Sequence, residues 1–236
     1  MLSLNDLSVT LDDGTAVVGE TEVVIEPGER LLVAGESGTG KSTLVRALAG
    51  LWPWGGGSVN FHPDRRLFML PQKPYIPSGT LRRAIAYPGA AEDWTLERDR
   101  RAPCTRSASI TSRRRSRKRR RGTRRCPAAK SSGWRSRGCL LHNPDIVVLD
   151  EATSALDEKS QDKMMEIVIK ELPKATIVSV AHRAELEAFH SRKIVLERRK
   201  GGAKLVSDID LIPRKGKRRL LGRFLRHRKL PAKKAA

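Results

Sequence analysis

The stretch Arg30–Leu51 reads RLLVAGESGTGKSTLVRALAGL, and it decides the fold. Its middle, Gly35–Ser42, fits the template G-x-x-x-x-G-K-[ST], in which glycines let successive backbone N–H groups face a phosphate. An apolar run, Arg30–Ala34, precedes the motif, and apolar residues recur at helical spacing after it. In this strand–loop–helix setting we expect Lys41 to reach the β- and γ-phosphates of a nucleotide and Ser42 to ligate Mg²⁺.

Strand and helix signals alternate along the rest of the chain. The first thirty residues alternate apolar runs with tight-turn signals, which predicts short strands. Further apolar runs predict strands at 67–70, 146–149, 176–180 and 193–196. An apolar stripe predicts a helix over Glu158–Glu171. Strands separated by helical segments are typical of α/β proteins, so we expect a parallel α/β sheet.

Two carboxylates follow a buried-strand pattern. Ile146–Leu149 is apolar throughout, and Asp150 and Glu151 come directly after it. A strand of a parallel α/β sheet places such residues at the edge where ligands bind. We therefore expect Asp150 to hold the Mg²⁺ shell and Glu151 to act as general base toward an attacking water. An apolar strand followed by Asp-Glu is common, so this prediction depends on the phosphate loop.

The residues after these carboxylates carry a family resemblance. Leu149–Asp157 reads LDEATSALD, which resembles the second carboxylate motif and D-loop of ABC-type ATPases. Gln72 is similar to the Q-loop glutamine of that family, and His182 to its switch histidine. The resemblance covers residues 1 to about 97 and 139 to about 212. It implies an α/β P-loop NTPase fold with a RecA-like core, a small antiparallel β subdomain from the first thirty residues, and a helical subdomain.

The resemblance also implies what the site binds. The cofactors are ATP and Mg²⁺, and two ATP molecules are enclosed when two ATP-binding domains close as a head-to-tail dimer. Glu151 and His182 are the implied catalytic residues. The implied nucleotide-binding residues are Gly35, Glu36, Ser37, Gly38, Thr39, Gly40, Lys41, Ser42, Thr43 and Gln72, and the implied Mg²⁺ ligands are Ser42, Gln72 and Asp150.

Two further stretches of sequence narrow the resemblance to one group within the family. LAGLWPWG at Leu48–Gly55 and LPQKPY at Leu70–Tyr75 are similar to the ATPase part of fused half-transporters, the group of peroxisomal acyl exporters and SbmA- and BacA-like transporters. The expected partners are a second ATP-binding domain and a membrane-spanning permease domain. The expected location is peripheral, at the cytoplasmic face of a bacterial inner membrane. Residues 1–50 contain no aromatic side chain, so the adenine-stacking residue of many ABC ATPases is missing.

The positive charge is concentrated in two segments. The chain has 236 residues, with 47 Lys and Arg against 26 Asp and Glu. Residues 98–138 hold 17 basic residues and one acid, and residues 213–236 hold 11 basic residues and no acid, so the remainder is mildly acidic. A large basic excess usually indicates nucleic acid or an anionic membrane surface as partner, and here only these two segments carry it. Three cysteines match no zinc or disulfide pattern, which favours a reducing compartment, and no run approaches the ~20 apolar residues of a membrane span.

The segment 98–139 departs most from the family. The resemblance requires an LSGGE signature before the second carboxylate motif, because it caps the γ-phosphate held by the partner subunit, and this sequence has none. Three interpretations stay open: a disordered basic insert, a nucleic-acid-binding patch, and a compensated frameshift. The frameshift interpretation also explains the amino-acid sequence of the segment. A coding strand for PWDQTLSGGEKQRLAFARL can be written that, read one base later, gives Arg121–Cys139 in full.

The predicted organisation is one ABC-type ATP-binding domain, 1–212, with its helical subdomain disrupted at 98–139, followed by a basic tail, 213–236. The tail fits a basic amphipathic helix on anionic lipid, and a solvated tail is the alternative. The expected function is an ATP-binding and hydrolysing subunit that powers an ABC transporter through dimerisation. The alternatives are a basic P-loop protein that binds nucleic acid and an inactive relic of a transporter gene.

Overall fold

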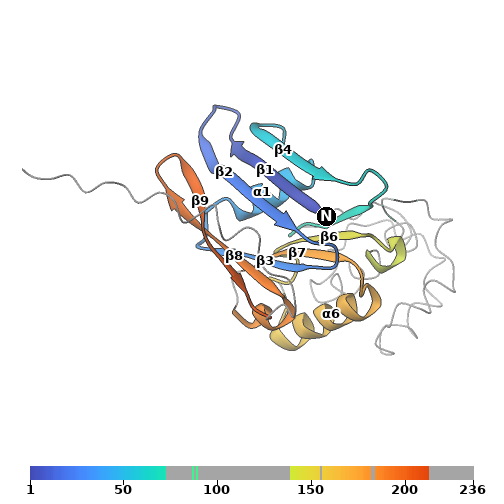
Figure 1. Cartoon of the computed structure of the whole chain (residues 1–236). Helices are drawn as coiled ribbons and strands as arrows, with labels where there is room; N and C mark the ends of the chain where they lie inside the picture. Colours follow the sequence, from blue (N-terminus) through green and yellow to red (C-terminus); the bar gives the residue numbers. More distant parts are fainter. Residues whose placement is uncertain (73–86, 88, 90–138, 155, 182–183, 213–236) are drawn as a thin grey trace, which may run out of the picture.

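The computed structural model of this chain describes residues 1–72, 87, 89, 139–154, 156–181 and 184–212 (Figure 1). The expected helical subdomain, the basic segment up to residue 138, His182 and the basic tail lie outside the described residues.

Nine strands form one mixed sheet in the described part of the chain, in the order β4-β1-β2-β9-β8-β3-β7-β6-β5. Neighbours among β5, β6, β7, β3 and β8 pair in parallel, whereas β1 pairs antiparallel with β2 and β4, and β8 with β9. The predicted α/β fold is therefore confirmed. The strands are β1 (Leu2–Thr10), β2 (Ala16–Ile25), β3 (Arg30–Gly35), β4 (Gly55–Phe61), β5 (Leu67–Leu70), β6 (Ile146–Asp150), β7 (Thr176–Val180), β8 (Arg192–Arg199) and β9 (Gly202–Asp210).

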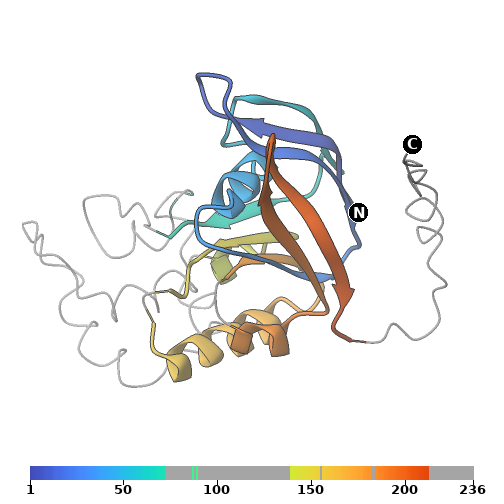
Figure 2. The same cartoon turned by 90° about the vertical axis from the view of Figure 1, so that its left-hand side faces the viewer.

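Helices cover the two faces of the parallel strands. Figure 2 shows α1 (Lys41–Leu48) between these strands and the antiparallel ones, and α6 (Glu158–Glu171) on the opposite side with the 3₁₀ helix η3 (Ala184–Phe189). Successive side chains of a strand point to opposite faces. Accordingly Val148 of β6 packs in the core beneath α1, and Val147 and Leu149 pack in the core beneath α6. Both faces of the central strands are thus buried, as parallel sheets require.

The helix predicted over Glu158–Glu171 is confirmed as α6 with the same bounds. Asp157 caps it, because its carboxylate accepts a hydrogen bond of 3.3 Å from the Ser160 N–H. The helix after the phosphate loop ends at Leu48, before Gly50, whose φ of 72° is left-handed.

Two strands were not predicted from the sequence. β4 begins with three glycines, a composition that is depleted in strands, and it pairs with β1 at the edge of the sheet. The antiparallel part therefore draws β4 from beyond the first thirty residues and is continuous with the parallel strands. β9 alternates small, polar and apolar residues, and its pairing with β8 makes it a strand.

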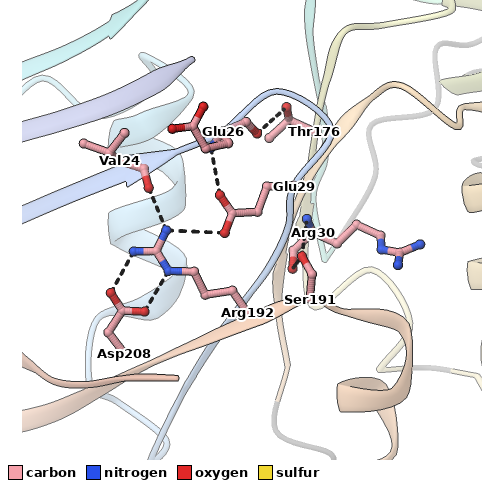
Figure 3. Close-up of polar contacts among 8 residues, drawn as sticks. All are labelled: Val24, Glu26, Glu29, Arg30, Thr176, Ser191, Arg192 and Asp208. Carbon is pink, nitrogen blue, oxygen red and sulfur yellow. Dashed lines mark hydrogen bonds and ion pairs between the residues drawn. The ribbon is translucent and has the colours of Figure 1, made fainter. Parts of the chain in front are cut away.

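A partly buried arginine joins the two parts of the sheet (Figure 3). Arg192 at the start of β8 pairs with Asp208 of β9 through two bonds of 2.7 Å, and it donates to the Val24 carbonyl of β2 at 2.6 Å. Its Nη1 also lies 3.4 Å from Glu29 in the turn before β3. The Asp208 and Glu29 carboxylates raise the pKa of Arg192, so this guanidinium stays charged. It fixes the turn that leads into the phosphate-loop strand.

Gln161 of α6 generates a stability prediction. Its side chain is 1% exposed, and neither amide atom has a hydrogen-bond partner. A buried polar group left unsatisfied costs about 1–3 kcal/mol, and methionine has a similar shape without that cost. We expect Gln161→Met to raise the free energy of unfolding by about that amount in urea denaturation. Gln161→Glu, which buries a charge at the same place, should lower it. A Gln161→Met variant less stable than the parent would contradict the conclusion that the unsatisfied Gln161 amide lowers stability.

Candidate nucleotide site

The ends of four neighbouring parallel strands form one edge that carries the predicted site residues. The strand order β5-β6-β7-β3 places the segments after these strands side by side. The strand register aligns the ends of β5, β6 and β7, because Leu70 lies opposite Leu149 and Asp150 lies opposite Val180. Ligands of open α/β sheets bind at this carboxyl edge. The edge therefore brings together the phosphate loop, Gln72, Asp150 and Glu151.

Two glycines of the phosphate loop are required by its geometry. Gly35 has φ 145°, and a Cβ there would lie 2.3 Å from the Leu196 carbonyl oxygen. Gly40, the residue before α1, has φ 83°, and its Cβ would lie 2.6 Å from a methyl carbon of Val17. A side chain at either position would clash and strain the backbone. The glycines thus let the loop turn tightly from β3 into α1, whose first N–H groups have no partner within the helix.

Lys41 is held by the loop it belongs to. Its Nζ donates to the Gly35 carbonyl at 2.9 Å and to the Glu36 carbonyl at 2.6 Å, and it lies 3.4 Å from Thr39 Oγ1. The residue is 3% exposed. Burial lowers the pKa of Lys41, and the Glu151 carboxylate partly opposes this shift. The ammonium group is therefore short of negative charge, which a phosphate would supply.

Asp150 is fully buried at the end of β6 and pairs with Arg46 of α1. Arg46 Nη2 lies 3.1 Å from Asp150 Oδ2, while Asp150 Oδ1 is buried and has no hydrogen-bond partner among the described residues. A buried carboxylate oxygen that lacks a donor indicates a missing ligand. Ser42 lies in the first turn of α1, so the expected Mg²⁺ ligands fit a cation at this end of the helix.

Glu151 and Gln72 contact each other, as the shared edge predicts. Gln72 Nε2 donates a hydrogen bond of 2.7 Å to Glu151 Oε2. Glu151 has φ 48°, a left-handed conformation that is uncommon for residues other than glycine. Such conformations cluster at functional sites, where surrounding contacts maintain them. The turn bends the chain away from β6 directly after Asp150, so the two adjacent carboxylates have different partners: Arg46 for Asp150 and Gln72 for Glu151.

The described structure thus brings together all the predicted site residues except His182, which lies outside the described residues. Arg46 was missed from the sequence, because its contact with Asp150 spans 104 positions. One signal was available: Arg46 follows Ser42 by four positions, which puts both on one helix face.

An open pocket of about 370 Å³ lies beside the tip of the phosphate loop. Gly38 and Thr39 form one wall, Leu11 and Val17 contribute apolar surface from β2 and the turn before it, and the β8–β9 turn closes the far side. Arg198 and Arg199, the last two residues of β8, also line the pocket, and the Arg199 guanidinium lies 2.8 Å from the Glu197 carboxylate. None of the described residues that line it is aromatic.

A buried histidine supports β7, the strand that leads to His182. A carbonyl only accepts, so His190 Nδ1 donates to the Leu186 oxygen at 2.6 Å and Nε2 accepts from the Ser179 hydroxyl at 2.8 Å. Burial lowers the pKa of His190, the Leu186 carbonyl opposes the shift, and the Arg30 charge adds to it. The neutral imidazole therefore holds the end of β7 in place.

Cys139 is the one cysteine among the described residues, and it is fully buried in the core beneath α6. Burial raises the pKa of its thiol to about 12. It therefore acts as a small apolar side chain.

The mixed sheet, the glycine loop leading into α1 and the carboxylates at the strand edge define a P-loop nucleotide-binding protein. The ABC transporter family profile matches residues 18–154. The chain belongs to this family, whose ATP-binding domains are ATPases.

Relatives and a solved structure agree with this assignment. An uncharacterised ABC transporter ATP-binding protein of Haemophilus influenzae is 32% identical over 81% of this chain and 32% of its own length. ABC transporter D family member 3 of Dictyostelium discoideum is 31% identical, with coverages of 80% and 28%. The human lysosomal cobalamin transporter ABCD4 is 35% identical, with coverages of 74% and 30%. A bacterial Atm1-family ABC exporter with ATP bound has the same fold, with a TM-score of 0.72 at 21% identity over 89% of this chain and 39% of that one.

This chain spans about a third of the length of the curated relatives it matches. In the part that the structure describes, no helix is both long and apolar enough to cross a membrane.

His190 generates a pH prediction. Its pKa is lower in the folded state than the value of about 6.5 for an exposed histidine, so the unfolded chain takes up the proton first. The stability that neutral His190 contributes is full above about pH 6.5 and falls as the pH drops toward the folded-state pKa. We expect the stability advantage of the parent over His190→Gln, from urea unfolding, to shrink between about pH 8 and about pH 5.5. An advantage that is constant or grows on acidification would contradict this.

Proposed function

We propose that this chain is the ATP-binding and hydrolysing part of an ABC half-transporter. The observation that carries the proposal is the convergence of Lys41, Asp150 and the Gln72–Glu151 pair at one edge of the sheet. Family membership supports it. Each group matches one need of phosphoryl transfer: a cation for the phosphates, a metal ligand, and a base for the attacking water.

The phosphate loop binds the triphosphate. Backbone N–H groups of Gly38, Gly40 and the first turn of α1 face the phosphates, and the helix N-terminus favours their negative charge. Lys41 exchanges the carbonyls of Gly35 and Glu36 for the β- and γ-phosphate oxygens. Ser42, Gln72 and Asp150 would hold Mg²⁺, which neutralises phosphate charge when bound.

Glu151 orients the attacking water and accepts its proton. Its bond to Gln72 fixes the carboxylate at the rim of the site until a ligand is present. The family resemblance gives His182 the role of the switch histidine, as a second catalytic residue.

The open pocket beside the loop receives the nucleoside. Its phosphate-loop wall makes it continuous with the triphosphate site, and Leu11 and Val17 offer aliphatic surface to the base. Arg198, which also lines the pocket, takes the place of the missing aromatic ring, because arginine planes stack on π systems. Aliphatic and stacking contacts do not recognise the hydrogen-bonding groups of a base. The pocket would therefore select bases by their size and planarity.

A second ATP-binding domain and a membrane-spanning permease domain are the proposed partners. The part of the relatives that lies outside this match is about two thirds of their length, which is room for a membrane domain. The chain would then work at the cytoplasmic face of a bacterial inner membrane, and the tail 213–236 adds positive charge that attracts anionic lipid.

We further propose that the domain extends over 1–212 and that residues 98–139 are a frameshifted version of the signature region. The proposal rests on the recovered LSGGE text. Sequencing the gene tests it. A verified read that encodes the basic text, with no family text in the adjacent frame, would overturn it.

Lys41→Ala tests the nucleotide site. The substitution removes the cation that faces the β- and γ-phosphates, and a charge-assisted contact of this kind is worth about 1.5–3 kcal/mol, or roughly 10- to 100-fold in affinity. We expect a loss of that size in Mg²⁺-dependent ATP binding measured by calorimetry. Lys163→Ala on the exposed side of α6 is the matched control and should bind like the parent. Equal binding by Lys41→Ala and the parent would show that the site assignment is wrong.

A repaired chain tests the signature proposal. Loss of one preorganised donor to a developing charge costs roughly 10²- to 10³-fold in kcat, and here the whole signature is replaced. We expect little phosphate release from the chain as written and recovery when 98–139 carries the frame-restored text. Glu151→Gln should silence the repaired chain.

The same assay can refute the frameshift. Robust, Glu151-dependent hydrolysis by the chain as written, with no gain on repair, would show that the basic segment is a working part.

A further inference from the structure

Arg46 belongs to no motif but reaches the expected metal ligand. It lies on α1 four positions after Ser42, so both side chains share one face of the helix. Helical side chains lean toward the N-terminus, which carries Arg46 back toward the turn that holds Ser42. Its Nη2 lies 3.1 Å from Asp150 Oδ2. The guanidinium therefore lies where Ser42 and Asp150 would share a cation.

The surroundings of Asp150 require positive charge. The Asp150 side chain is 0% exposed, and an isolated buried carboxylate is strongly disfavoured unless it is paired. Arg46 provides that charge through one oxygen and leaves Oδ1 without a partner. The Arg46 side chain itself is 40% exposed, so it has room to move away from the carboxylate.

We propose that Arg46 is the resident counter-ion of Asp150: it neutralises the carboxylate when no metal is bound and opposes Mg²⁺ when the metal arrives. This inference rests on the proposed function. A positive unit charge beside a divalent cation is strongly repelled in a site of low polarity. Arg46 therefore reduces the gain in ATP affinity that Mg²⁺ provides. The same charge attracts a triphosphate that carries no metal. Arg46 is thus a positioning residue that lowers the dependence of ATP binding on Mg²⁺.

The quantity to measure is the ratio of ATP affinity in excess Mg²⁺ to that in EDTA, with the full chain and binding followed by calorimetry. Arg46→Met should weaken binding in EDTA and retain or strengthen it in Mg²⁺, so the ratio should rise about tenfold over the parent. Arg46→Lys, which keeps the charge, should stay near the parent. Lys163→Met removes one exposed positive charge from α6 and is the matched control, with an unchanged ratio expected.

Stability provides a second readout. Arg46→Met leaves Asp150 buried and unpaired, so its unfolding midpoint without ligand should fall below that of the parent. The double variant Arg46→Met with Asp150→Asn removes both charges and should recover stability. A purely structural arginine would produce this stability pattern without changing the ratio.

The outcomes separate the two proposals. A ratio in Arg46→Met that stays within about threefold of the parent overturns the counter-ion role. If the parent binds no ATP in either condition, the proposed function fails, and this inference fails with it.

Discussion

The register of four parallel strands is the constraint on which the site depends. Leu70 opposite Leu149 and Asp150 opposite Val180 bring the ends of β5, β6 and β7 to one height, and β3 continues the row into the phosphate loop. Because side chains alternate along a strand, a slip of one residue would exchange the two core faces. The buried alternation beneath α1 and α6 thus fixes the height of every functional group at the edge.

Three contacts in the site have a common character: each charged or polar group has a partner from the protein where a ligand would lie. Lys41 contacts loop carbonyls where phosphate oxygens would lie, Arg46 compensates Asp150, and Gln72 holds Glu151. Lys41 and Asp150 are buried charges, which cannot remain uncompensated, so ligand binding at these two groups would be an exchange of partners. The net affinity for nucleotide is the difference between the new contacts and these resident ones.

The parts of this arrangement that were predictable have local signals. The loop Gly35–Ser42, helix α6 and the carboxylate pair after β6 follow from motif spacing and apolar periodicity. β4 and β9 were missed because Gly-rich and mixed sequences become strands through pairing with their neighbours. Arg46 was missed because its role depends on the contact with Asp150, which lies about a hundred positions away in the sequence. His182 and the basic segment stay predictions.

If residues 98–139 stand in place of the signature, as proposed, ATP binding and ATP hydrolysis would depend on different parts of this chain. The described core residues lie between Leu2 and Leu70 and between Cys139 and Ala203, and they position the phosphate loop, Asp150 and Glu151. Those contacts are made between residues that the structure describes. A signature segment acts on the other subunit's nucleotide, so its replacement removes charge stabilisation in the partner site. A chain with an intact core and an altered signature should therefore bind ATP well and turn it over poorly.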